Sequence, residues 1–281
     1  MTSTVPRRVA HKAGIDLPVV GLGTWRTFSH PDPDRLAGVL QAAREAGAEL
    51  VDTAPVYSDA EPRLAALLRG DRTFFVATKI WDTDPDAVEA VFRSQLAAYG
   101  RPSIDLLQVH NLNGWRGNLE WLDRQKTAGR IRFTGVTYQF DHAFGIGGSR
   151  ADLIRVIEDD LVDFVQINLN AAETSLAEDA LPAAAESGIG VVVMRPFGEG
   201  ELLASPPPAE WLRELGCSSW PETLLRWVLT HTQVTSVLTA TSRPQHFRAN
   251  AAAARSGPLG PDEAAEVTKY ARSVLGAGVR R

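Results

Sequence analysis

The chain has 281 residues, of which 44% are hydrophobic and 22% are charged, and its formal net charge at pH 7 is −5. This composition is typical of a folded globular protein and excludes a wholly disordered chain. The acidic balance provides no basic field for a phosphate backbone, so we expect small-molecule partners and no nucleic acid.

The cysteine count and the hydropathy pattern bear on the compartment. The chain has one cysteine, Cys217, which excludes an internal disulfide and fits a reducing environment. No apolar run reaches the length of a membrane span, and the residues after Arg7 and Arg8 lack the apolar stretch of an export signal. We therefore expect a cytoplasmic protein without a membrane partner.

Short apolar, β-branched runs recur along the chain and predict its architecture. The residues at their ends are Thr24, Asp52, Lys79, His110, Thr137, Gln166, Arg195 and Thr239. The first seven lie about 30 residues apart, which is the length of one strand, one helix and two loops. Eight such units predict an α/β fold, a single (β/α)8 TIM barrel over residues 1–281, in preference to an open doubly wound sheet.

The segments between these runs predict helices and loops. Residues 85–96 have helical spacing and begin with a proline, so a helix is expected there. An N-terminal β-hairpin plug is expected within residues 9–20, closing the opposite end of the barrel. The glycine-rich stretch 145–149 lacks the dinucleotide-binding spacing and is expected to be a loop. A proline-rich insertion at residues 205–208, flanked by Trp211 and Trp220, is expected to form a lid or rim.

The strand ends carry the chemistry. Catalytic residues of such barrels come from the carboxyl ends of the strands, where Asp52, Lys79 and His110 stand, and Tyr57 follows five residues after the first. An ammonium about 4 Å from a phenol favours phenolate by about 4 kcal/mol at an effective dielectric of about 20, which would lower the phenol pKa by about 3 units. Lys79 is the candidate ammonium and Asp52 would hold it charged. With His110 orienting a carbonyl, this set suits carbonyl reduction.

Each of these residues also has a structural interpretation. Asp52 and Lys79 would serve as an ion pair, Tyr57 as packing, and His110 as a buried hydrogen-bonding group. Their joint placement on neighbouring strands favours the catalytic interpretation. A barrel lyase or isomerase acting on a phosphorylated substrate, without nicotinamide, is a further alternative.

Several segments, in order from about residue 19 to residue 250, resemble the aldo-keto reductases. These are Gly21-Leu22-Gly23-Thr24-Trp25, Val51-Asp52-Thr53-Ala54-Pro55-Val56-Tyr57, Ala77-Thr78-Lys79, Leu107-Gln108-Val109-His110, Gly129-Arg130-Ile131-Arg132-Phe133-Thr134-Gly135-Val136 and Phe164-Val165-Gln166. The resemblance implies a reductase that transfers a hydride from NADPH to an aldehyde or ketone. It implies Tyr57 as proton donor, Lys79 and Asp52 as the groups that tune it, and His110 as the group that orients the carbonyl.

The resemblance also implies where an extended NADPH is held. The expected cofactor residues are Gly23, Thr24, Trp25, Thr137, Gln166, Met194, Arg195, Pro196, Phe197, Gly198, Thr241, Ser242, Arg243, Arg248 and Asn250. Hydroxyls and helix amides at Thr241 and Ser242 bind phosphate well, and Arg243 or Arg248 would engage a 2′-phosphate. NADPH is therefore expected in preference to NADH.

The cradle departs from the family pattern at three positions. Thr137-Tyr138 stands where relatives commonly have Ser-Asn, Met194 replaces a stacking tyrosine, and Ala240 replaces a lysine. These changes motivate an alternative function, a nicotinamide-binding sensor or regulatory subunit with vestigial activity. On the substrate side, the resemblance and the strand ends indicate Trp25, Trp81 and Asn111, and no metal site is expected.

Overall fold

The computed structural model describes residues 4–30, 32–139 and 147–278. Eight of its strands are parallel and close into a barrel in the order β10-β3-β4-β5-β6-β7-β8-β9. These strands are β3 (Val20–Gly23), β4 (Leu50–Asp52), β5 (Phe75–Ile80), β6 (Ile104–Val109), β7 (Ile131–Tyr138), β8 (Phe164–Asn168), β9 (Gly190–Met194) and β10 (Val234–Ala240). The prediction of a (β/α)8 barrel is confirmed.

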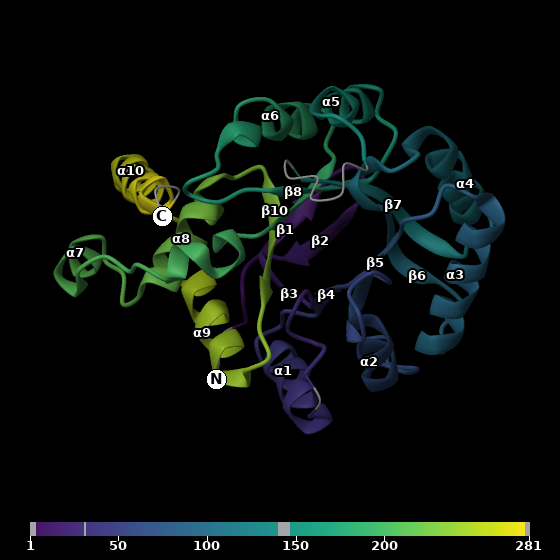
Figure 1. The fold of residues 1–281 in the computed structure, drawn as a ribbon, viewed down its shortest axis with the longest axis horizontal. Coiled ribbons are helices and arrows are strands. Elements are labelled where there is room, and N and C mark those ends of the chain that lie inside the picture. The colour runs from purple at the N-terminus through teal and green to yellow at the C-terminus, as the bar shows by residue number, and fades with distance from the viewer. Residues whose placement is uncertain (1–3, 31, 140–146, 279–281) are drawn as a thin grey trace.

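Helices surround the strands, and α7 and α10 lie on the outer side of α8 and α9 (Figure 1). The helices are α1 (Pro33–Glu45), α2 (Ala60–Leu67), α3 (Pro85–Tyr99), α4 (Trp115–Thr127), α5 (Arg150–Glu158), α6 (Ala180–Glu186), α7 (Ala209–Glu214), α8 (Trp220–Thr230), α9 (Pro244–Arg255) and α10 (Pro261–Gly278), with short 3₁₀ segments η1 (His110–Leu112), η2 (Ser175–Ala177) and η3 (Gly198–Leu203). No helix in the described ranges is long and apolar enough to cross a membrane.

Helix α3 illustrates why the sequence folds locally as expected. The Asp84 side chain accepts hydrogen bonds from the backbone amides of Asp86 and Ala87, and Pro85 takes the first helical position, where its missing N–H costs nothing. Gly100 ends the helix with φ 61°, a left-handed conformation that glycine adopts without strain. The predicted helix is present and extends one turn past residue 96.

The N-terminal hairpin consists of β1 (Arg7–Ala10) and β2 (Ile15–Pro18), which pair antiparallel. Ala10 and Leu17 of the hairpin are buried in one apolar cluster with Leu50, Ala77, Leu106, Phe164, Val192 and Leu238 of the barrel. Arg8 donates hydrogen bonds to the carbonyls of Leu229 and His231 at the end of α8 and of Val234 at the start of β10. The predicted hairpin is confirmed, and it packs on the amino ends of the strands.

Inward-facing side chains divide the barrel interior into an apolar half and a polar half. Near the hairpin, Phe75 stacks on Phe133 with ring centres 6.0 Å apart, and both rings contact Phe164. Four residues after Phe75 on β5 the inward residue is Lys79, and two residues after Phe164 on β8 it is Gln166, and both are polar. We call the carboxyl-end half, where these polar groups lie, the mouth of the barrel.

The two tryptophans of the insertion after β9, which was expected to form a lid or rim, pack against α10. Trp211 and Trp220 pack against Tyr270 of α10, with ring centres 5.4 and 5.5 Å from it, and the Trp220 indole donates a 2.7 Å hydrogen bond to the carbonyl of Leu202. Both tryptophans are therefore committed to joining the insertion to α10. Of the predicted glycine-rich loop, Gly145 and Ile146 lie outside the described residues.

Candidate active site

A buried ion pair lies at the centre of the mouth. Lys79 on β5 donates to both carboxylate oxygens of Asp52 on β4, each at 2.8 Å, and to the carbonyl of Thr53 at 2.7 Å. The Lys79 side chain is fully buried and that of Asp52 is 4% exposed. All three ammonium protons are therefore directed, and the charge is held in one place.

The two partners respond differently to burial. Burial acts to lower the pKa of Lys79, but Asp52 and Tyr57 outweigh it and raise that pKa above its usual value. Burial raises the pKa of Asp52, and Lys79 opposes this rise. Lys79 therefore carries its positive charge throughout the neutral range.

Tyr57 lies in the loop between β4 and α2, above this ion pair. The Lys79 ammonium is 5.3 Å from the centre of the Tyr57 ring. Burial raises the pKa of Tyr57, and the opposing effect of Lys79 does not cancel it. This reverses the lowering expected from an isolated ammonium and phenol, because that expectation omitted the loss of water around the phenol and the negative charge of Asp52. At neutral pH Tyr57 holds its proton.

His110 begins η1, directly after β6, and faces the same space. Its ring packs edge-on against Tyr57, with centres 6.0 Å apart, and against Trp81 at 4.9 Å. Burial lowers the pKa of His110 to about 3, with a further contribution from Lys79, so the imidazole is neutral at physiological pH. Its buried Nδ1 has no hydrogen-bond partner among the described residues.

Aromatic side chains form the walls beside Tyr57 and His110. The Trp25 ring lies 4.8 Å from that of Tyr57, and Trp25 is 39% exposed. Trp81 is half-buried, and its carbonyl accepts a 2.6 Å hydrogen bond from the Asn113 amide. Of the residues expected on the substrate side, Trp25 and Trp81 thus stand next to the proton-bearing groups. Asn111 is 4% exposed and hydrogen-bonds to Thr137.

Below these groups lies a layer of side-chain amides that contains one residue not singled out from the sequence, Gln108. Its amide donates to Gln166 Oε1 at 3.0 Å and to Asp52 Oδ1 at 3.4 Å. Gln166 in turn donates to Asp52 Oδ2 at 3.5 Å and to the sulfur of Met194 at 3.7 Å. Side chains on a strand alternate between its two faces, so Gln108 shares the inward face with Leu106 and His110. This alternation could have identified Gln108 from the sequence.

The expected cofactor residues fall into three groups along the mouth. Thr24 is fully buried and donates to the Asp52 carbonyl and the Thr53 hydroxyl, so it fixes β3 on β4. Thr137 and Gln166 are direct neighbours on β7 and β8. The third group comprises the segments that follow β9 and β10.

The segment after β9 is held by a two-sided ion pair. Glu199 contacts Arg195 at 2.8 Å and Arg26 at 3.1 Å, so it joins the loop after β3 to the loop after β9. Arg195 also donates to Gln139 at 2.7 Å. Pro196, Phe197 and Gly198 lead from Arg195 into η3, and Gly198 has φ 55°. In this arrangement the Arg195 guanidinium is engaged by protein groups.

The two arginines after β10 that were expected to bind a 2′-phosphate differ in their contacts. Arg248 forms an exposed ion pair with Glu45 of α1 at 3.0 Å. Arg243, at the start of α9, is exposed and has no side-chain partner among the described residues. Arg35 of α1, which the sequence did not single out, donates to the Ser242 carbonyl at 2.6 Å.

The remaining expected positions after β10 serve the local turn. Thr241 Oγ1 accepts from the Arg243 amide at 3.1 Å, and Asn250 is buried within α9. Within the described ranges, no group of three or more histidine, cysteine, aspartate or glutamate side chains is arranged to hold a metal ion.

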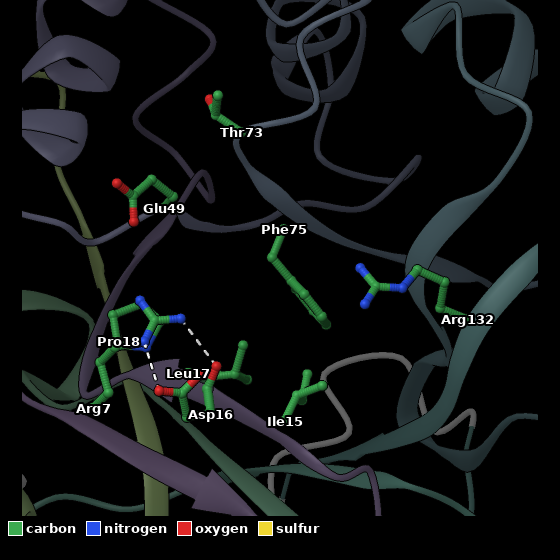
Figure 2. A pocket seen from close by; sticks show the side chains of 9 residues that line it. All are labelled: Arg7, Ile15, Asp16, Leu17, Pro18, Glu49, Thr73, Phe75 and Arg132. Carbon is green, nitrogen blue, oxygen red and sulfur yellow. Dashed lines mark hydrogen bonds and ion pairs between the residues drawn. The ribbon is translucent and has the colours of Figure 1, made fainter.

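A cavity of about 240 Å³ lies at the opposite end of the barrel (Figure 2). It is lined by hairpin residues and by residues at the amino ends of the strands, among them Phe75, Glu49 and Arg132. Figure 2 shows Arg7 turned to Asp16, and Arg132 is paired with Asp105 at 2.6 Å. Its charged groups therefore mostly neutralise one another, and it is separated from Tyr57 by the aromatic floor of the barrel.

Comparison with protein families agrees with this geometry. The model of the Aldo/keto reductase family matches residues 19–272. The chain belongs to this family. The match begins at β3 and ends within α10, so it includes all eight barrel strands and every group described in the mouth.

Individual relatives are distant but cover most of the chain. An aldo-keto reductase of Mycobacterium sp. (strain KMS) is 28% identical over 252 residues, which are 86% of this chain and 85% of the relative. A D-threo-aldose 1-dehydrogenase of Pseudomonas sp is 27% identical over 256 residues, 77% of this chain and 76% of that protein.

Solved structures share the fold. An aldo-keto reductase from Bacillus halodurans in its holo form superposes with a TM-score of 0.79 at 19% identity, covering 95% of this chain and 96% of that one. An aldo-keto reductase from Klebsiella pneumoniae in complex with NADPH gives a TM-score of 0.76 at 19% identity, covering 97% and 96%.

Proposed function

We propose that this protein transfers a hydride reversibly between NADPH and an aldehyde or ketone. The observation that carries the proposal is the convergence of a protonated phenol, a neutral imidazole and a buried, charged lysine on one space in the mouth, with two tryptophans beside it. Family membership fits this reaction. NADPH supplies the hydride when it is bound.

The four side chains divide the work on the carbonyl oxygen. His110, neutral because its pKa is about 3, donates a ring N–H to that oxygen and orients it toward Tyr57. As the hydride reaches the carbonyl carbon, the O–H bond of Tyr57 breaks and the new O–H bond of the alcohol forms. The resulting phenolate lies beside Lys79, whose charge stabilises it, and solvent returns the proton. Asp52 keeps Lys79 charged and in position.

The residues present fit a nicotinamide cofactor. Gln166 and Thr137 offer amide and hydroxyl groups on neighbouring strands, and the Met194 sulfur lies beside Gln166 as a polarisable apolar surface. Arg243 is the arginine of the β10–α9 segment whose side chain is open to a phosphate. Because Arg248 is already paired with Glu45, we assign preference for NADPH over NADH to Arg243 first.

The direct test is oxidation of NADPH, followed by absorbance, with a panel of aldehydes and ketones. The same enzyme is then assayed in reverse with NADP⁺ and alcohols, including an aldose, because the Pseudomonas relative carries the name D-threo-aldose 1-dehydrogenase. Tyr57→Phe removes only the phenolic hydroxyl and should reduce kcat by roughly 10²- to 10⁴-fold. Turnover that is equal in Tyr57→Phe and the parent protein would refute the assignment of the proton donor.

Fluorescence titration with NADPH and NADH separates the alternatives. Binding without turnover of any carbonyl would favour a sensor or regulatory subunit. That alternative is motivated by Tyr138, Met194 and Ala240, which differ from the residues common in the family. Absence of binding to either nucleotide would favour a lyase or isomerase and would end the present proposal.

A further inference from the structure

Asn111 has a backbone conformation that restricts which residues can follow His110. Its φ is 51° and its ψ is 32°, in the left-handed region, where asparagine, aspartate and glycine are favoured over other residues. Its N–H donates to the Thr137 hydroxyl at 2.8 Å, and its carbonyl accepts from the Gly148 amide at 2.9 Å. The turn therefore ties the end of β6 to β7 and fixes where the Asn111 side chain starts.

The Asn111 side chain makes one contact and leaves one group open. Its Oδ1 accepts from the Thr137 hydroxyl at 3.4 Å. Its Nδ2 has no hydrogen-bond partner among the described residues, although Asn111 as a whole is only 4% exposed. Asn111 Nδ2 is not one of the fully buried atoms without a partner, so the small exposed part of this residue includes a donor that can reach water or a ligand. The open group is thus a donor at the edge of the mouth.

The neighbouring groups complete a surface that matches a primary carboxamide. Thr137 donates its only proton to Asn111 Oδ1 and accepts from the Asn111 amide, which leaves one lone pair on its oxygen. Gln166, paired in register with Thr137, already accepts from Gln108 at 3.0 Å. A carboxamide needs a donor for its oxygen and an acceptor for its NH₂ group, and Asn111 Nδ2 and Thr137 Oγ1 supply one of each.

We propose that Asn111 is a cofactor-binding residue, and that its Nδ2 donates to the oxygen of the nicotinamide carboxamide while Thr137 accepts from the carboxamide NH₂. This inference rests on the proposed function. It moves Asn111 from the substrate side, where the sequence placed it, to the cofactor side. It also provides an amide donor at the cofactor site, where Tyr138 stands in place of the asparagine common in relatives.

The test compares NADPH with its thionicotinamide analogue, in which sulfur replaces the carboxamide oxygen and accepts hydrogen bonds weakly. Asn111→Gly removes the amide and keeps the left-handed turn, because glycine adopts positive φ without strain. We expect the Kd for NADPH to rise roughly 2- to 12-fold, the range for one neutral hydrogen bond. The Kd for the thio analogue should change much less. Both are measured by fluorescence titration, with a thermal melt to verify folding.

Asn111→Asp provides a second variant should the glycine variant fail to fold. Aspartate also tolerates the left-handed turn and keeps an oxygen for Thr137, but it replaces the donor by an acceptor. It should weaken NADPH binding at least as much as glycine does. If the parent protein does not bind NADPH, the proposed function fails. If it does bind, and either folded variant binds NADPH as tightly as the parent or loses equal affinity for NADPH and the thio analogue, the inference about Asn111 is wrong.

Discussion

Replacement of Lys79 by methionine tests how strongly the folded protein depends on the buried ion pair between Lys79 and Asp52. Methionine has a similar length but no charge, so Lys79→Met leaves the Asp52 carboxylate buried with two long hydrogen bonds, 3.4 Å from Gln108 and 3.5 Å from Gln166. Removing one partner of a buried ion pair costs about 3 to 5 kcal/mol. We expect a loss of that size in the free energy of unfolding at neutral pH, measured by urea denaturation with tryptophan fluorescence.

The pH dependence of this loss follows from the direction of the Asp52 pKa. Burial raises the pKa of Asp52 even with Lys79 present, and without Lys79 it rises further. A group whose pKa is raised by folding stabilises the folded state below its unfolded pKa, and that stability is lost as the pH rises through the folded pKa. The gap in unfolding free energy between Lys79→Met and the parent protein should therefore narrow as the pH is lowered from about 8 to about 5.

A second ion pair offers a matched control. Lys126 binds both oxygens of Asp163 at 2.9 and 2.7 Å, as Lys79 binds Asp52, but the Lys126 side chain is 38% exposed. Lys126→Met should cost less than Lys79→Met because Asp163, although only 5% exposed, keeps hydrogen bonds from the backbone amide and the hydroxyl of Thr134. The double variant with Asp52→Asn and Lys79→Met, which removes both buried charges, should regain much of the loss. An equal cost for the two lysine variants, or a gap that widens at low pH, would refute the reasoning.

Three further predictions follow from the other groups of the mouth. Burial lowers the pKa of His110 to about 3, so the stability that neutral His110 contributes is complete above its unfolded pKa of about 6.5 and is lost as the pH falls toward 3. His110→Gln should therefore make the free energy of unfolding depend less on pH below about 6.5. An unchanged dependence in this range would contradict the prediction. Arg243→Gln should raise the Kd for NADPH roughly tenfold or more without affecting NADH, whereas Arg248→Gln should have a smaller effect because Glu45 already engages that arginine; equal effects in titration would count against the assignment. Gln108→Leu removes the donor to Gln166 and Asp52 and should weaken NADPH binding roughly 2- to 12-fold, and an unaltered Kd would show that Gln108 does not position Gln166.

The barrel and the central groups of the mouth were predictable because they depend on local patterns. A recurring strand-helix length indicates the barrel, and strand ends in a closed parallel barrel must meet at one end, which brings Asp52, Lys79 and His110 together. Tyr57 was accessible because it follows Asp52 in a short loop. The direction of the Tyr57 pKa shift could not be predicted in the same way. It depends on how much water the folded mouth removes from the phenol, and the spacing of residues along the chain does not give that amount.

Contacts between segments that are distant in the sequence could not be predicted, because they depend on how the helices pack. The ion pair between Arg248 and Glu45 joins α9 to α1, and the bond from Arg35 to the Ser242 carbonyl joins α1 to the turn before α9. Either arginine of the β10–α9 segment satisfied the sequence pattern equally well. Only the packing of α1 against α9 shows that one of them is already engaged.

The apolar half of the barrel explains how so many polar groups can lie together inside the other half. Phe75, Phe133 and Phe164 and the hairpin residue Leu17 fill the amino end and exclude water from below. In the dry space above them a hydrogen bond is stronger, but an unpaired polar group costs more. The layer of Asp52, Lys79, Gln108 and Gln166 meets most of this demand by bonding its members to one another, and Gln108 Oε1 is its one buried atom without a partner among the described residues. Because Asp52 contacts both Lys79, which serves Tyr57, and Gln166, which we assign to the cofactor, a change on either side of the mouth alters the partners of one carboxylate.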